Sequence, residues 1–101
     1  MRIAFIVEYD GTEYAGWQVQ KNAVTVQEKI EEALLTLNKG HITVTGAGRT
    51  DSGVHARGQC GHFDIDSDIP ADKFTFILNT RLPKDIRIKR IFCCYISLFT
   101  K

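Results

Sequence analysis

The chain has 101 residues, 44% hydrophobic and 25% charged, which is ordinary for a single globular domain. A formal net charge of +1 gives no global sign of a nucleic-acid binder. Its three cysteines, Cys60, Cys93 and Cys94, lack disulfide-framework spacing, which favours reduced thiols and a cytoplasmic location. No signal peptide is evident, and no apolar run reaches transmembrane length.

The first predicted element is a strand over residues 3–9. Apolar residues occupy every second position from Ile3 to Tyr9, and the apolar Ile6 between them predicts burial on both faces. A long loop follows, from Asp10 to Val24. Loops of this length often carry function.

A helix is predicted next. Thr25 and Glu28 have the spacing of a capping box, which marks a helix start. The apolar residues that follow share one helical face: Val26, Ile30, Ala33, Leu34 and Leu37. Gly40 fits the end of this helix.

The second half of the chain repeats the alternation of strand and helix. Residues 42–46 and 59–65 read as strands, Pro70 suits a first helical turn, and a last strand includes Ile86. The apolar face of the second helix carries Phe74, Ile77 and Leu78. The order β-α-β-β-α-β predicts a ferredoxin-like α+β sandwich, an antiparallel sheet with two helices on one face.

The segment Gly46–Ala56 carries one carboxylate, Asp51, among glycines, with Arg49 two residues before it. A nearby guanidinium favours the ionised carboxylate. Such a group acts as a nucleophile or base but cannot start a reaction as a general acid. The alternative is an ordinary turn with a surface ion pair. The glycine spacing fits neither a P-loop nor a dinucleotide-binding fingerprint, which argues against nucleotide-cofactor binding.

Four segments occur in a telling order: Glu8–Gln18, Val24–Glu28, Gly46–Ala56 and Asn79–Pro83. Together they resemble the N-terminal half of the tRNA pseudouridine synthase A (TruA) family, over about residues 2–88. The resemblance implies an enzyme that isomerises uridine to pseudouridine in the anticodon stem-loop of tRNA, at nucleotide positions 38, 39 and 40. The target base must be flipped out of its stack, at a cost of a few kcal/mol.

The resemblance also assigns roles to two residues. Asp51 matches the family's essential aspartate, and Arg49 matches an arginine thought to hold the flipped base and pair with that aspartate. It implies no metal and no organic cofactor, tRNA as the partner, and a homodimer for the full-length family. Attack on the sugar, attack on the ring and removal of a sugar proton all stay open for Asp51.

Further RNA contacts are expected at Tyr14, Trp17, Gln18, Lys21, His55 and Arg81. For Trp17 the alternative is a core residue beneath the loop. A basic cluster also stands late in the chain: Arg81, Lys84, Arg87, Lys89 and Arg90. These cations pair with phosphates, or they lie on a solvated edge strand that resists aggregation. Cys60 and His62 are too few for a metal site, and a half-buried strand explains both.

The segment 91–101 is apolar and departs from the family pattern, so we expect residues 1–90 to be a catalytic half and the C-terminal half to be absent. An open half-cleft cannot exclude water, so a truncated chain is expected to be weak or inactive alone. The alternative for this segment is that it extends the last strand or covers the core. The alternatives for function are a non-catalytic ferredoxin-like RNA-binding module and a defective fragment.

Overall fold

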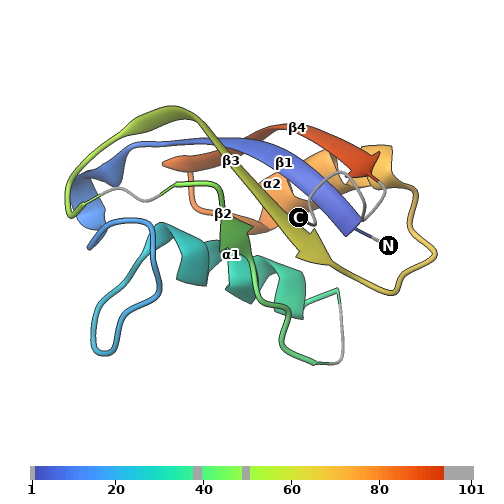
Figure 1. Ribbon diagram of the computed structural model, residues 1–101, viewed down its shortest axis with the longest axis horizontal. Coiled ribbons are helices and arrows are strands. Elements are labelled where there is room, and N and C mark those ends of the chain that lie inside the picture. Colours follow the sequence, from blue (N-terminus) through green and yellow to red (C-terminus); the bar gives the residue numbers. More distant parts are fainter. Residues whose placement is uncertain (1, 38–39, 49–50, 95–101) are drawn as a thin grey trace.

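The computed structural model describes residues 2–37, 40–48 and 51–94. Within them, four strands form one antiparallel sheet in the order β2-β3-β1-β4, and two helices pack against one face (Figure 1). The bounds are β1 Arg2–Tyr9, η1 Gly11–Glu13, α1 Val26–Leu35, β2 Thr45–Gly46, β3 Ala56–Asp64, η2 Ala71–Lys73, α2 Phe74–Arg81 and β4 Ile86–Cys94. The predicted ferredoxin-like α+β fold is confirmed.

Strand β1 is central, as its apolar pattern predicts. It pairs with β3 on one side, where Ile3 lies opposite Phe63, and with β4 on the other, where Phe5 lies opposite Ile91. Alternate β1 residues from Ile3 onward are buried in the core beneath the helices. Ala4, on the opposite face, is also buried.

Both helices begin where local sequence favours it. The hydroxyl of Thr25 accepts a hydrogen bond from the backbone N–H of Glu28 at 3.3 Å, which caps α1. Pro70 precedes the short 3-10 helix η2, and α2 itself starts at Phe74. The predicted first turn at Pro70 is therefore a 3-10 turn, and the α-helix begins a turn later.

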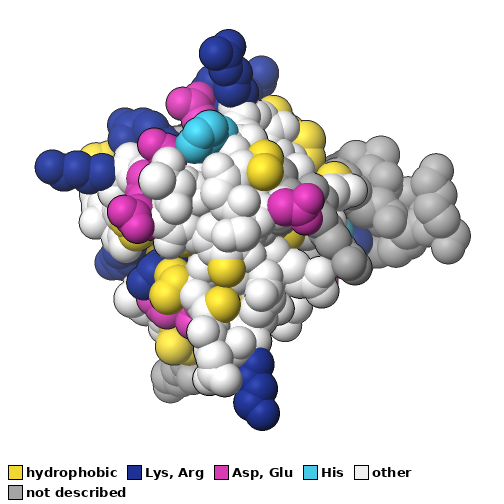
Figure 2. All heavy atoms as spheres, turned by 90° about the vertical axis from the view of Figure 1, so that its left-hand side faces the viewer, with side chains coloured by type: hydrophobic (Ala, Val, Ile, Leu, Met, Phe, Trp, Pro, Cys, Tyr) yellow, Lys and Arg dark blue, Asp and Glu magenta, His cyan; other side chains and the backbone are white. Residues whose placement is uncertain are grey.

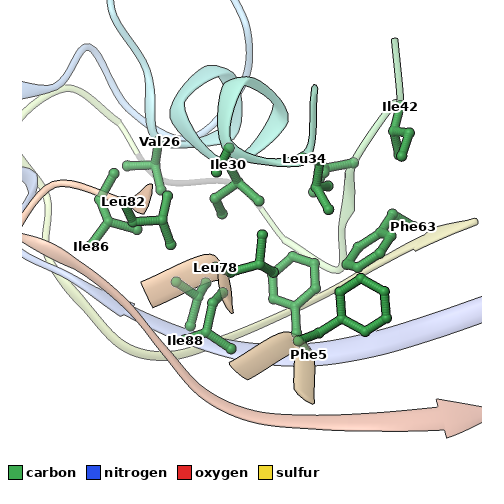
Figure 3. Close-up of a cluster of buried hydrophobic side chains, with 14 of the residues drawn as sticks. Phe5, Val26, Ile30, Leu34, Ile42, Phe63, Leu78, Leu82, Ile86 and Ile88 are labelled. Atoms are coloured by element: carbon green, nitrogen blue, oxygen red, sulfur yellow. The ribbon is translucent and has the colours of Figure 1, made fainter. Parts of the chain in front are cut away.

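The core lies between the helices and the sheet (Figure 3). The ring centroids of Phe5 and Phe63 are 6.1 Å apart, and Phe63 meets Phe74 edge-on at the same separation. Leu34 from α1 and Leu78 from α2 are fully buried in the same cluster. Each such side chain contributes about 1.5–3 kcal/mol by leaving water, so this contact fixes both helices on the sheet.

The strand predicted over residues 42–46 is shorter than expected, because only Thr45 and Gly46 pair with β3. The reason lies in Val44, whose N–H donates to the carboxylate of Glu31 at 2.9 Å and whose carbonyl accepts from the side-chain amide of Gln27 at 2.8 Å. Side chains of α1 thus replace a neighbouring strand. The approach to the Asp51 loop is held by the helix as well as by the sheet.

Strand β4 forms one edge of the sheet and runs through Cys94. The first residues of the segment 91–101 therefore extend the last strand, one of the two alternatives raised for it. Residues 95–101 lie outside the described part of the chain.

Three connections converge at one end of the sheet: the residues after β1, those before β3 and those before β4 (Figure 1, left). The backbone N–H of Asp10 donates to the carbonyl of Asp85 at 2.9 Å, which joins the first of these to the third. None of the helices in the described residues has both the length and the apolarity needed to cross a bilayer.

Two phenylalanines of α2 give a matched test of the core. Phe74 is fully buried whereas Phe76 is 74% exposed. We expect Phe74→Ala to lower the free energy of unfolding by about 3–5 kcal/mol through the cavity it leaves. Phe76→Ala should change it by less than about 0.5 kcal/mol. Urea denaturation followed by circular dichroism measures both, and equal losses would contradict the described packing.

Candidate functional site

Asp51 lies in the connection between β2 and β3, with its side chain exposed to solvent. Its carbonyl accepts a hydrogen bond from the N–H of Val54 at 3.1 Å, which closes a turn. Gly53, within that turn, has φ of +78°, a conformation that favours glycine. The N–H of Gly53 donates to the carbonyl of Tyr14 at 3.1 Å. The turn is therefore anchored to the loop after β1, while the carboxylate stays accessible.

The same loop is pressed against the chain just after β1. A methyl group on Gly11 would overlap the backbone carbonyl of Val54, so this contact requires glycine. The N–H of Gly11 donates to Nδ1 of His55 at 2.9 Å. His55 is thus a positioning residue: it ties the end of the Asp51 loop to the end of β1.

Nδ1 of His55 also lies 3.1 Å from a carboxylate oxygen of Asp10. One ring nitrogen cannot accept from Gly11 and donate to Asp10 at once. The backbone N–H always carries its proton, so the acceptor role holds for the neutral imidazole. The ion pair requires a protonated ring.

Asp10 has donors of its own. Its carboxylate accepts from the hydroxyl of Thr12 at 2.6 Å and from the Thr12 N–H at 3.0 Å. These two bonds, in that order of size, hold the pKa of Asp10 below its usual value, with a smaller contribution from His55. Asp10 therefore caps η1 as an ionised group.

Tyr14 links the same region to β4. Its hydroxyl donates to a carboxylate oxygen of Asp85 at 2.5 Å. Burial first, and the Asp85 carboxylate second, raise the pKa of Tyr14 well above its ordinary value. The phenol therefore stays protonated and serves as a fixed donor.

The expectation that Tyr14 and Trp17 contact RNA is not supported by their positions. Tyr14 is 6% exposed and Trp17 only 2%, so neither offers a ring face on which a base could stack. Trp17 stacks on Tyr9 with centroids 6.1 Å apart, and a methyl group on Gly46 would overlap its indole. The alternative, a core role for Trp17 beneath the loop, describes the structure.

Gln18 and Lys21 are both exposed. Gln18 lines a hollow of about 240 Å³ together with Gly46 and Gly48, at the start of the Asp51 loop. Lys21 lies at a tight turn next to Asn22, which has φ of +64°. RNA contact by these two side chains stays a prediction.

Arg81 lies at the end of α2 and donates to the carbonyl of Ile77 at 3.2 Å. It lines a hollow with Lys29 and Pro83, between the helices and not beside the Asp51 loop. Its position therefore lends no support to the predicted RNA contact. Arg49 lies outside the described residues.

The late basic cluster divides in the structure. Lys89 pairs with Glu8 at 3.3 Å on the edge strand, as expected for a solvated edge. Lys84 and Arg87 instead line a hollow of about 340 Å³, which also includes His55 and Arg57. Figure 2 faces this end of the molecule and shows a histidine with acidic and basic side chains gathered on its upper part.

Sequence reasoning missed three anchors of the loop: Asp10, Gly11 and Asp85. The run Asp10-Gly11-Thr12 carried a signal, since an aspartate often bonds the N–H two residues on. Asp85 carried none, because its partner Tyr14 is 71 residues away. Among the described residues, no group of three or more His, Cys, Asp or Glu side chains is placed to hold a metal ion.

Comparisons with known proteins bear on this geometry. Residues 5–99 match the family model described as tRNA pseudouridine synthase. The chain is 50% identical to tRNA pseudouridine synthase A of Prochlorococcus marinus (strain MIT 9515), over 97% of this chain and 39% of that protein. Identity to the protein of the same name is 57% in Ruminiclostridium cellulolyticum and 53% in Nostoc sp., over 87% of this chain and 36% and 31% of theirs. The chain thus spans under two fifths of these relatives.

The contact at Gly11 generates a prediction. A side chain there must displace the backbone of Val54, so Gly11→Ala should lower stability by about 1–3 kcal/mol and shift the Asp51 loop. Gly58→Ala is the control, since its methyl group meets Ile6 at an ordinary 3.7 Å. NMR amide shifts of residues 51–55 measure the displacement, and unchanged shifts in Gly11→Ala would contradict the described contact.

Asp10 generates a pH prediction. Its pKa is lowered in the folded chain, so its carboxylate stabilises the fold above about pH 4 and loses this effect as pH falls through the folded pKa. Asp10→Asn should remove this part of the acid sensitivity. Thr12→Val should raise the pKa of Asp10, seen in an NMR titration of its carboxyl carbon. An Asp10 pKa unmoved by Thr12→Val would refute the assigned cause.

Proposed function

Because the chain belongs to the tRNA pseudouridine synthase family, we propose that it takes part in isomerising uridine to pseudouridine in the anticodon stem-loop of tRNA. The observation that carries the proposal is Asp51, an exposed carboxylate in a loop anchored on Tyr14 and Gly11. The chain spans 31–39% of the relatives' length, so the activity of the whole protein belongs to this proposal.

The reaction breaks the bond from C1′ of the ribose to N1 of the uracil and forms a bond from C1′ to C5. The hydrogen on C5 then leaves as a proton. Asp51 serves as the anionic group, either as nucleophile toward the sugar or the ring or as base toward a sugar proton. Arg49 is proposed to hold the flipped base and to pair with Asp51. No step requires a metal or an organic cofactor.

The loop geometry explains why a rigid anchor is useful. A detached uracil must turn within its site while the sugar waits, so the carboxylate has to keep its place. The Gly11 contact and the His55 hydrogen bond fix the loop against the sheet. Because Asp51 is exposed, a further surface must cover the base to exclude water. We therefore expect slow turnover by this chain on its own.

The test is Asp51→Asn, which keeps the shape of the side chain and removes its charge. Release of tritium from tRNA labelled at C5 of uridine, with protein in excess over tRNA, should fall by at least about 10³-fold. Binding of the tRNA should change by less than about twofold. The control is Asp66→Asn, another exposed carboxylate, outside the Asp51 loop.

Tritium release by Asp51→Asn at the wild-type rate would refute the catalytic role. Wild-type chain that binds tRNA but releases no tritium, with or without Asp51, would favour the alternative of a non-catalytic RNA-binding module. Loss of the circular dichroism signal in Asp51→Asn would show instead that the aspartate supports the fold.

A further inference from the structure

The hollow of about 340 Å³ beside the Asp51 loop lies where β1 ends and where β3 and β4 begin. Three of its lining residues are acidic and three are basic: Glu8, Asp10, Asp85, Arg57, Lys84 and Arg87. Formal charge alone therefore does not decide what it binds. The decisive difference is which of these groups already have partners.

The acidic groups are engaged within the protein. Glu8 pairs with Lys89 at 3.3 Å, and that lysine lies outside the hollow's lining. Asp10 accepts two hydrogen bonds from Thr12, and Asp85 accepts one from the buried hydroxyl of Tyr14. Their oxygens are thus occupied by local donors.

The basic groups are not engaged in this way. Arg57, Lys84 and Arg87 are exposed, and within the described part of the chain their side chains make no hydrogen bond or ion pair. They come from three separate places, the start of β3, the connection before β4, and β4 itself. Their donors meet only at this hollow, on the part of the surface shown in Figure 2.

The hollow adjoins the Asp51 loop directly. His55 belongs to both, since it lines the hollow and accepts the hydrogen bond that anchors the loop. We infer that Arg57, Lys84 and Arg87 bind a backbone phosphate of the RNA next to the nucleotide held at Asp51. The inference rests on the proposed function, and it adds a phosphate-binding subsite.

A phosphate suits these groups better than an acidic protein segment does. Two guanidinium groups present paired N–H donors that match phosphate oxygens. An RNA chain at Asp51 also brings a phosphate on each side of the bound nucleotide, so the hollow needs no second binding partner. Such a contact would position the backbone and carry no sequence preference.

The experiment compares two double variants that each remove two positive charges. Arg57→Gln/Arg87→Gln changes the hollow, and Lys29→Gln/Lys73→Gln changes exposed or half-exposed lysines in the helical layer. Binding of an RNA stem-loop is measured over a range of salt. The hollow variant should lower the slope of log affinity against log salt by about 2, one per cation, and the helical variant should leave it unchanged.

A second readout uses inorganic phosphate alone. Titration should shift the Nε–H signals of Arg57 and Arg87 in NMR spectra, and the signals of Lys29 and Lys73 amides should stay in place. Equal slopes for both variants, or wild-type affinity in the hollow variant, would overturn the inference and leave the tritium test of Asp51 standing. Phosphate and RNA binding through the hollow without tritium release would overturn the proposed function and keep the subsite.

Two further outcomes count against the subsite. A wild-type chain that binds no RNA would overturn it together with the proposed function. Binding of polyglutamate that depends on Arg57 and Arg87, without RNA binding, would identify an acidic protein segment as the ligand.

Discussion

The contact between Gly11 and the backbone of Val54 is the constraint on which the site depends. It brings the end of β1 and the Asp51 loop together with no room for a side chain, and the hydrogen bond from Gly11 to His55 fixes their relative height. Strand β1 is the most deeply buried strand of the sheet, so the loop is referenced to the least mobile part of the molecule. An exposed carboxylate thereby gains a defined position.

The fold supplies this constraint through a division of labour between its two ends and faces. Helices α1 and α2 cover one face and build the core, and Glu31 of α1 reaches across to Val44 to hold the approach to β2. The connections after β1 and before β3 and β4 remain at one end, where they exchange backbone and side-chain hydrogen bonds. Packing and chemistry therefore occupy different parts of a small domain.

Periodicity predicted much of the fold. The alternation around Phe5 and the capping box at Thr25 placed β1 and α1 correctly, because burial and capping are local properties of sequence. The extent of β2 was missed because its pairing is replaced by Gln27 and Glu31, a tertiary effect. Within the site, Asp51 was found from its motif, whereas the anchoring role of Gly11 was not, since a close approach of two backbones leaves no periodic trace. Burial of Trp17 was one of two possibilities that sequence could not separate.

The position of Trp17 has a practical consequence. It is the only tryptophan in the chain, it is buried against Tyr9, and its indole touches Gly46, where the Asp51 loop departs. Its fluorescence emission should be blue-shifted in the native protein and should respond to any displacement of the loop's root. The chain therefore contains an intrinsic optical probe of ligand engagement that needs no added dye.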